Sequence, residues 1–102
     1  MGNPRFDPEQ LDDHDPFEID TQAAHLFKHP HLGIDDVLEV WISDPLFYPA
    51  NPPAHCLMCA EVAGQVLVVP IAPSRTGHPH KCRPIGCYVA SQQLANQYRK
   101  DR

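Results

Sequence analysis

Four cysteines are the residues of this 102-residue chain whose type and spacing point most directly to chemistry. Two residues separate Cys56 from Cys59, four separate Cys82 from Cys87, and three histidines lie within a few positions of these pairs. Cysteine thiolates and histidine nitrogens are the ligands of tetrahedral zinc sites. A small zinc-binding domain that uses the four cysteines is therefore one interpretation of the sequence.

The strand-like sequence around both pairs argues against a shared metal site. Residues an odd number apart on a strand point to opposite faces of a sheet, so Cys56 is expected to oppose Cys59, and Cys82 to oppose Cys87. Reduced cysteines are often buried as small hydrophobic residues. We therefore expect four buried thiols, with neither a metal ion nor another cofactor.

Length and composition indicate one small domain. A chain of this size can bury a single modest core, which leaves no room for a separate cofactor domain. No apolar run reaches the roughly 18 residues of a membrane span, and the acidic N-terminus lacks the features of a signal peptide. The expected location is the cytoplasm, where thiols stay reduced.

Charge divides the chain into two halves. Residues 1–50 hold eleven Asp and Glu against Arg5 and Lys28, a net charge of -9, whereas residues 51–102 carry a net charge of +4. The basic half could meet the phosphates of a nucleic acid. The overall net charge of -5 opposes tight non-specific binding, which depends on Lys and Arg displacing counterions.

The N-terminal half is predicted to hold an arm, a short strand and two helices. Residues 1–16 combine three prolines with acidic side chains and are predicted to form a flexible acidic arm before a single domain over residues 17–102. A minimal strand at Phe17 is followed by a predicted helix over residues 22–29. Asp35 is the expected N-cap of a second helix that ends before Asp44-Pro45.

The C-terminal half is predicted to form most of a three- to four-stranded antiparallel sheet and a closing helix. Residues 46–54 contain three prolines and are predicted to be a loop. Two strands should meet at an Ala63-Gly64 turn, and residues 81–88 should form a third, weakened by Pro84. Ser91 is the expected cap of a final helix that runs to about Lys100. These elements define an α+β fold.

The order of these signals resembles that of the BrnT family of toxin components, over about four-fifths of the chain. The family shows the same sequence of short motifs, from an F-x-x-D start to an arginine-containing closing strand and a helix with a late tyrosine. The matching positions here are Phe17, Asp20, His29, Gly33, Asp44, Pro45, Arg83 and Tyr98. The resemblance implies a fold related to RelE-type ribonucleases, an antitoxin partner and association between copies of the chain.

The resemblance also implies a catalytic site. RelE-type toxins cleave RNA without a metal ion, so their sites must move protons and stabilise charge on the phosphoryl oxygens. His55 falls at the family's hairpin arginine, Arg83 and Tyr88 at the two arginines of its closing strand, and Tyr98 at its late tyrosine. Arg83 and Tyr98 match in kind, whereas His55 and Tyr88 are substitutes, and Leu94 replaces a helix glutamate.

The geometry of a strand adds one condition to this site. Arg83 and Tyr88 are five residues apart, so a regular strand would place them on opposite faces of the sheet. A bulge within residues 84–86 would be needed to bring both side chains to one face.

Three interpretations of function therefore stand beside one another. The first is a toxin-like or toxin-derived protein of a type II toxin–antitoxin system that acts as a metal-independent endoribonuclease on RNA. The second is a catalytically inactive protein-binding module of the same fold, and the third is the zinc-binding domain. The partners that follow from the first two are an antitoxin protein, an RNA substrate and a second copy in a homodimer.

Overall fold

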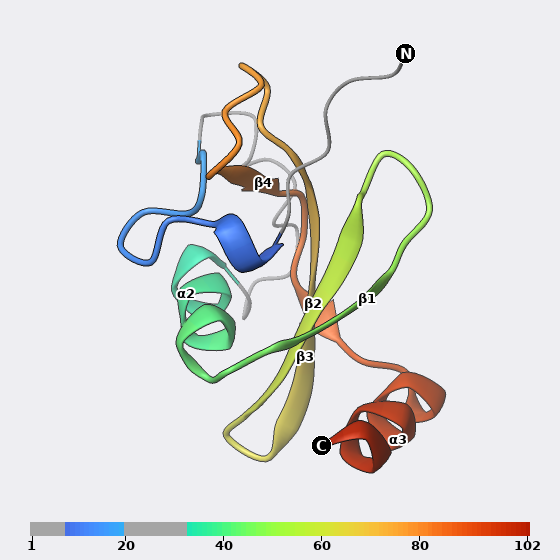
Figure 1. The fold of residues 1–102 in the computed structure, drawn as a ribbon. Helices are drawn as coiled ribbons and strands as arrows, with labels where there is room; N and C mark the ends of the chain where they lie inside the picture. The colour runs from blue at the N-terminus through green and yellow to red at the C-terminus, as the bar shows by residue number, and fades with distance from the viewer. Residues whose placement is uncertain (1–7, 20–32) are drawn as a thin grey trace.

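The computed structural model describes residues 8–19 and 33–102, which form an α+β fold around one antiparallel sheet (Figure 1). The elements are η1 (Pro8–Gln10), α2 (Ile34–Ile42), β1 (Leu46–Pro49), β2 (Cys56–Val62), β3 (Gln65–Pro73), β4 (Cys82–Pro84), β5 (Tyr88–Val89) and α3 (Gln92–Asp101). The predicted α+β class, antiparallel sheet and C-terminal helix are confirmed. The predicted helix over residues 22–29 lies outside the described residues.

Within the described residues the sheet has five strands, whereas three or four were predicted. β1 occupies part of the segment predicted to be a loop, and it pairs with β2 so that Phe47 lies opposite Met58. Its apolar and aromatic residues favour a strand, and Pro49 is tolerated because it lies on an edge strand. The single strand predicted over residues 81–88 is divided into β4 and β5, which both pair with β3.

The two faces of the sheet are covered differently. The face called the closed face carries Met58 and Val69, and it packs against α2 and the apolar side chains of the N-terminal segment. The opposite face, called the open face, carries Cys59 and Val68 and packs against α3. Figure 1 shows the two helices on opposite sides of the sheet. Side chains alternate between the faces because successive residues of a strand point in opposite directions.

The α2 helix starts earlier than the sequence predicts. Its N-cap is Gly33 rather than Asp35, and a carboxylate oxygen of Asp36 accepts a hydrogen bond from the Gly33 N–H at 2.7 Å. An acidic residue at this position satisfies a free N–H group and suits the positive end of the helix dipole. The helix then presents Val37 and Val40, both fully buried, to the closed face.

Residues 8–16, the described part of the arm predicted for residues 1–16, contact the folded domain. Leu11 is buried in the core of the closed face, and the backbone N–H of Asp12 donates to the carbonyl oxygen of His80 at 2.9 Å. Pro16 accepts a hydrogen bond from the N–H of Cys82 at 2.8 Å, next to a parallel bridge between Phe17 and Cys82. The buried residues Leu11 and Pro16 and these backbone bonds attach the segment to the domain despite its acidic composition.

The α3 helix is fixed to the open face near its two ends. The Ser91 hydroxyl accepts a hydrogen bond from the Leu94 N–H at 3.2 Å, which confirms the predicted cap. At the other end, the Tyr48 hydroxyl donates to Asp101 at 2.9 Å, and Arg102 donates to the carbonyl oxygen of Asp44 at 2.9 Å. No helix within the described ranges is both long and apolar enough to cross a membrane.

Candidate functional site

Arg83 and Tyr88 lie on the same face of the sheet, the open face. On β3, Arg83 pairs with Ala72 and Tyr88 pairs with Val68, two residues that share a face. If the register of β4 continued into β5, Cys87 would lie opposite Val68. The chain therefore contains one extra residue between the two strands, which is the bulge that the sequence requires for this pair to share a face.

A groove occupies the part of the open face beside Tyr88. It has a volume of about 470 Å³. The residues that line it are Pro49, Ala50, Asn51, Pro53, Ala54, Leu57, Pro70, Ile85 and Tyr88. Tyr88 is 36% exposed, and partial burial raises the pKa of its phenol above the ordinary value of 10. The hydroxyl is therefore protonated at neutral pH and can donate a hydrogen bond, while the ring offers a surface for stacking.

Arg83 lines a second hollow, here called the arginine pocket, beyond the end of β3. This pocket has a volume of about 570 Å³ and is lined by Pro53, Pro73, Ser74, Arg75, Thr76, Gly77 and Arg83. The Nε of Arg83 donates to the carbonyl oxygen of Pro73 at 3.0 Å, which fixes the guanidinium beside the strand end. Pro53 lines both hollows, so the groove and the arginine pocket adjoin.

His55 lies directly before β2, at the same level of the sheet as Arg83. Its backbone N–H donates to the carbonyl oxygen of Ile71 at 2.7 Å, and the residue after Ile71 is the partner of Arg83 on β3. Tyr88 pairs four residues further along β3, which corresponds to about 13 Å at the usual rise of a strand. The structure thus brings His55 and Arg83 to one level and places Tyr88 further along the same face.

Tyr98 stands apart from the other three predicted site residues. Its side chain is 1% exposed and packs between α3 and the sheet, where its hydroxyl accepts a hydrogen bond from the Glu61 N–H at 3.2 Å. Leu94, at the position of the family's helix glutamate, packs against the same cluster. Both residues therefore support the fold, and Tyr98 is not part of the site argued below.

The four cysteines are buried and form no disulfide. Cys56 and Cys59 lie on opposite faces, as predicted, but Cys82 and Cys87 are both on the closed face, because the bulge changes the alternation between them. Burial raises the thiol pKa of Cys56 and Cys87 to about 11 and that of Cys59 to about 12, and it also raises the pKa of Cys82.

These thiols are consequently protonated at neutral pH. Because Cys59 lies across the sheet from the other three, the four side chains do not converge on a single ion. In the part of the chain that the structure describes, no group of three or more His, Cys, Asp or Glu residues is placed to hold a metal.

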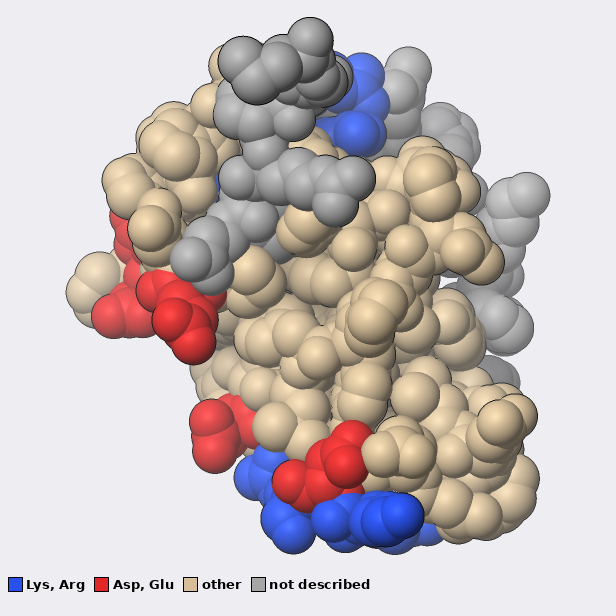
Figure 2. Space-filling model, turned by 45° about the vertical axis from the view of Figure 1, so that its right-hand side comes forward, with Lys and Arg blue, Asp and Glu red and all other residues tan. Residues whose placement is uncertain are grey.

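Charged side chains lie away from the groove. None of the described residues that line it is charged. Figure 2 shows an uncharged area in the middle of the surface, with Lys and Arg side chains gathered at its lower edge over the end of α3, whose last turn holds Arg99 and Lys100. The arginine pocket, which adjoins the groove, is lined by two basic residues, Arg75 and Arg83.

Sequence reasoning missed Arg75 and the role of Glu18 beside it. A carboxylate oxygen of Glu18 accepts a hydrogen bond from the Arg75 N–H at 2.9 Å, although the two residues are 57 positions apart. The sequence signal was weak, because a Ser-Arg-Thr-Gly run between prolines is typical of any surface turn. The contact with the N-terminal segment distinguishes this turn from an ordinary connection.

Comparisons of the chain with protein-family models, curated proteins and solved structures found no match. The resemblance to the BrnT family thus depends on the order of short motifs in the sequence.

Proposed function

We propose that this chain is a toxin-like protein of a type II toxin–antitoxin system, and that it cleaves RNA without a metal ion where the groove meets the arginine pocket. The supporting observation is the bulge, which brings Arg83 and Tyr88 to one exposed face with His55 at the level of Arg83. An antitoxin protein and a second copy of the chain are the partners expected for this class.

Each of the three residues has a separate role in this proposal. His55 takes the proton of the 2′-hydroxyl, whose oxygen attacks the adjacent phosphorus, and then returns the proton to the departing 5′ oxygen. Arg83 stabilises the charge that develops on the phosphoryl oxygens. Tyr88, about 13 Å further along the sheet, binds a neighbouring base by stacking instead of acting on the cleaved phosphate.

The test is cleavage of a short single-stranded RNA in the presence of a chelator. Arg83→Ala is expected to lower the rate by about 100-fold, the usual loss when one group that stabilises transition-state charge is removed. Arg99→Ala removes the same charge from the surface of α3 and should retain the wild-type rate. A wild-type rate in Arg83→Ala, with an unchanged circular dichroism spectrum, would disprove the proposal.

A second function is favoured by the composition of the groove. Its lining is uncharged and contains three prolines and Tyr88, and apolar and aromatic residues are typical of the centres of protein interfaces. A non-catalytic protein-binding module of the same fold would lose its partner, the protein encoded beside it, on Tyr88→Ala and keep it on Arg83→Ala. Partner binding combined with no RNA cleavage by the wild-type protein would select this function.

A further inference from the structure

The side of α2 that faces away from the sheet carries two exposed apolar residues. Val37 and Val40 are fully buried against the closed face, whereas Leu38 is 42% exposed and Ile42 is 72% exposed. Ile42 is the most exposed large apolar side chain among the residues that the structure describes. Leu38 and Ile42 are four residues apart, so their side chains lie next to each other on one side of the helix. A single exposed apolar residue is ordinary, but two neighbours form a continuous apolar strip.

Two carboxylates flank this apolar strip. Asp35 and Glu39 are exposed and are also four residues apart, so they lie beside Leu38 and Ile42 on the same outward side of the helix. These four residues are here called the outer face of α2. Within residues 8–19 and 33–102, neither of the two carboxylates takes part in a hydrogen bond or an ion pair. Both charges are therefore accessible to a partner.

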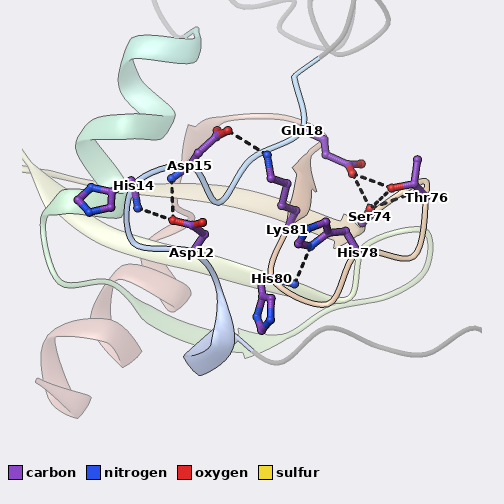
Figure 3. A network of polar contacts seen from close by, with 9 residues as sticks. All are labelled: Asp12, His14, Asp15, Glu18, Ser74, Thr76, His78, His80 and Lys81. Atoms are coloured by element: carbon purple, nitrogen blue, oxygen red, sulfur yellow. Dashed lines mark hydrogen bonds and ion pairs between the residues drawn. The ribbon is translucent and has the colours of Figure 1, made fainter.

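Other acidic residues of the N-terminal half have partners inside the molecule. Asp15 forms an ion pair with Lys81 at 2.9 Å, and Glu18 accepts a hydrogen bond from the Ser74 hydroxyl. Figure 3 shows both carboxylates directed at the loop that follows β3. Asp36, within α2 itself, caps the start of the helix. The two carboxylates of the outer face differ from these, because the described part of the fold does not use their charge.

The composition of the outer face selects the chemistry of a partner. Burial of its apolar strip against another apolar surface would release water from both, and carboxylates beside the strip would attract Lys or Arg side chains. A second copy of this chain fits the same surface poorly, because two outer faces placed against each other would bring their carboxylates together. A partner whose apolar strip is flanked by basic side chains is complementary in both respects.

The backbone of α2 favours a helical partner over an extended one. The N–H and C=O groups in the middle of a helix are hydrogen-bonded within it, so the outer face offers no backbone partners to an added strand. Side chains four residues apart instead form a ridge, beside which a second helix can pack its own ridges. Because α2 has nine residues, the contact is small, and we expect a dissociation constant in the micromolar range that rises with salt.

We propose that the outer face of α2 binds an amphipathic helix of a partner protein, in which an apolar strip is flanked by Lys or Arg. The apolar strip of the partner packs on Leu38 and Ile42, and its basic side chains pair with Asp35 and Glu39. This inference goes beyond the proposed function, because α2 covers the closed face of the sheet and the groove lies on the open face (Figure 1). A partner bound to α2 leaves the groove accessible.

The experiment uses two synthetic helical peptides that differ only in charge. The first has two leucines four residues apart, flanked by lysines on an alanine background, and the second has glutamates in place of the lysines. Their dissociation constants are measured by titration calorimetry at low salt with wild type and with variants of the outer face. The matched controls are Val89→Ala, which shortens an exposed apolar side chain of β5, and Glu61→Gln, which removes a carboxylate beside α3.

The lysine peptide should bind wild type and lose affinity in the variants of the outer face. Ile42→Ala and Leu38→Ala should each weaken binding about tenfold, because each removes apolar surface from the contact. Glu39→Gln should weaken it about threefold at low salt and have no effect at high salt. The two controls should bind like wild type, and the glutamate peptide should bind wild type at least about tenfold more weakly than the lysine peptide.

Three results would overturn the inference. The first is equal affinity of wild type, Ile42→Ala and Leu38→Ala for the lysine peptide, with unchanged circular dichroism spectra. The second is equal affinity of wild type for the two peptides, because charge would then play no part in recognition. The third is a dimer of the wild-type protein that Ile42→Ala dissociates in sedimentation experiments, because the outer face would then bind a second copy of the chain.

Discussion

The closed face and the open face of the sheet are built from the same alternating strands, but they differ in what covers them. On the closed face, α2 and the N-terminal segment bury a continuous apolar cluster. On the open face, α3 covers the area around Val68, and the groove occupies the area around Pro70. Tyr88 lines the groove, and Arg83 lines the adjoining arginine pocket.

This difference separates residues that support the fold from residues that are accessible to a ligand. A buried apolar side chain contributes free energy of folding and cannot contact RNA, whereas a side chain in the groove contributes less to folding and is free to bind. Residues of the core and residues that line the groove or lie at the surface should therefore differ in their mutational effects. Three pairs of variants test this expectation, in order of decreasing effect.

The largest effect should come from adjacent residues of β2. Met58 is fully buried on the closed face, and Leu57 lines the groove. Met58→Ala should lower the free energy of unfolding by about 3 kcal/mol because it leaves a cavity in the core. Leu57→Ala should cost only about 1 kcal/mol, since its side chain is partly in water already. Urea denaturation measures both, and equal losses would contradict the distinction between the faces.

A smaller effect should separate two tyrosines of the open face. Tyr98→Phe removes the hydroxyl that accepts a hydrogen bond from the Glu61 N–H and should lower the free energy of unfolding by about 1 kcal/mol. Tyr88 lines the groove and is 36% exposed, so Tyr88→Phe should change stability by less than about 0.5 kcal/mol. If Tyr88→Phe proved the more destabilising of the two, Tyr88 would be a residue of the core and not of a binding site.

The fold class could be predicted from local sequence patterns, and the structure contains the elements that these patterns predicted. The alternation of β2 and β3, the Ala63-Gly64 turn and the Ser91 cap each depend on residues close in sequence. β1 was missed because its prolines dominated the composition of a short segment. Whether such a segment becomes a strand depends on an available partner strand, which is not a local property.

The candidate site was harder to predict because it depends on register and on distant contacts. The sequence showed that Arg83 and Tyr88 need a bulge, but only the pairing of β4 and β5 with β3 places it. The contact between Glu18 and the turn at Arg75 joins residues more than fifty positions apart, and no local pattern predicts it. Tyr98 matched the family in type, yet burial gives it a structural role.

The smallest effect on stability is expected at Glu18, which links the N-terminal segment to the turn that follows β3. Its hydrogen bonds to Ser74 and other groups of the turn lower the pKa of the Glu18 carboxyl below its ordinary value of 4.5, even though burial raises it. A lowered folded-state pKa stabilises the protein above the unfolded-state pKa, and this stabilisation is lost as the pH falls through the folded-state pKa. Glu18 is partly exposed, so the contribution should be less than about 1 kcal/mol.

Glu18→Gln should therefore lower the free energy of unfolding at pH 7 by that small amount and reduce its decline between about pH 5 and pH 3 relative to wild type. Glu39→Gln, a change of the same type on the exposed surface of α2, is the control and should follow the wild-type curve. If the acid unfolding of Glu18→Gln matched that of wild type, the hydrogen bonds between Glu18 and residues 74–76 would not contribute to the stability of the fold.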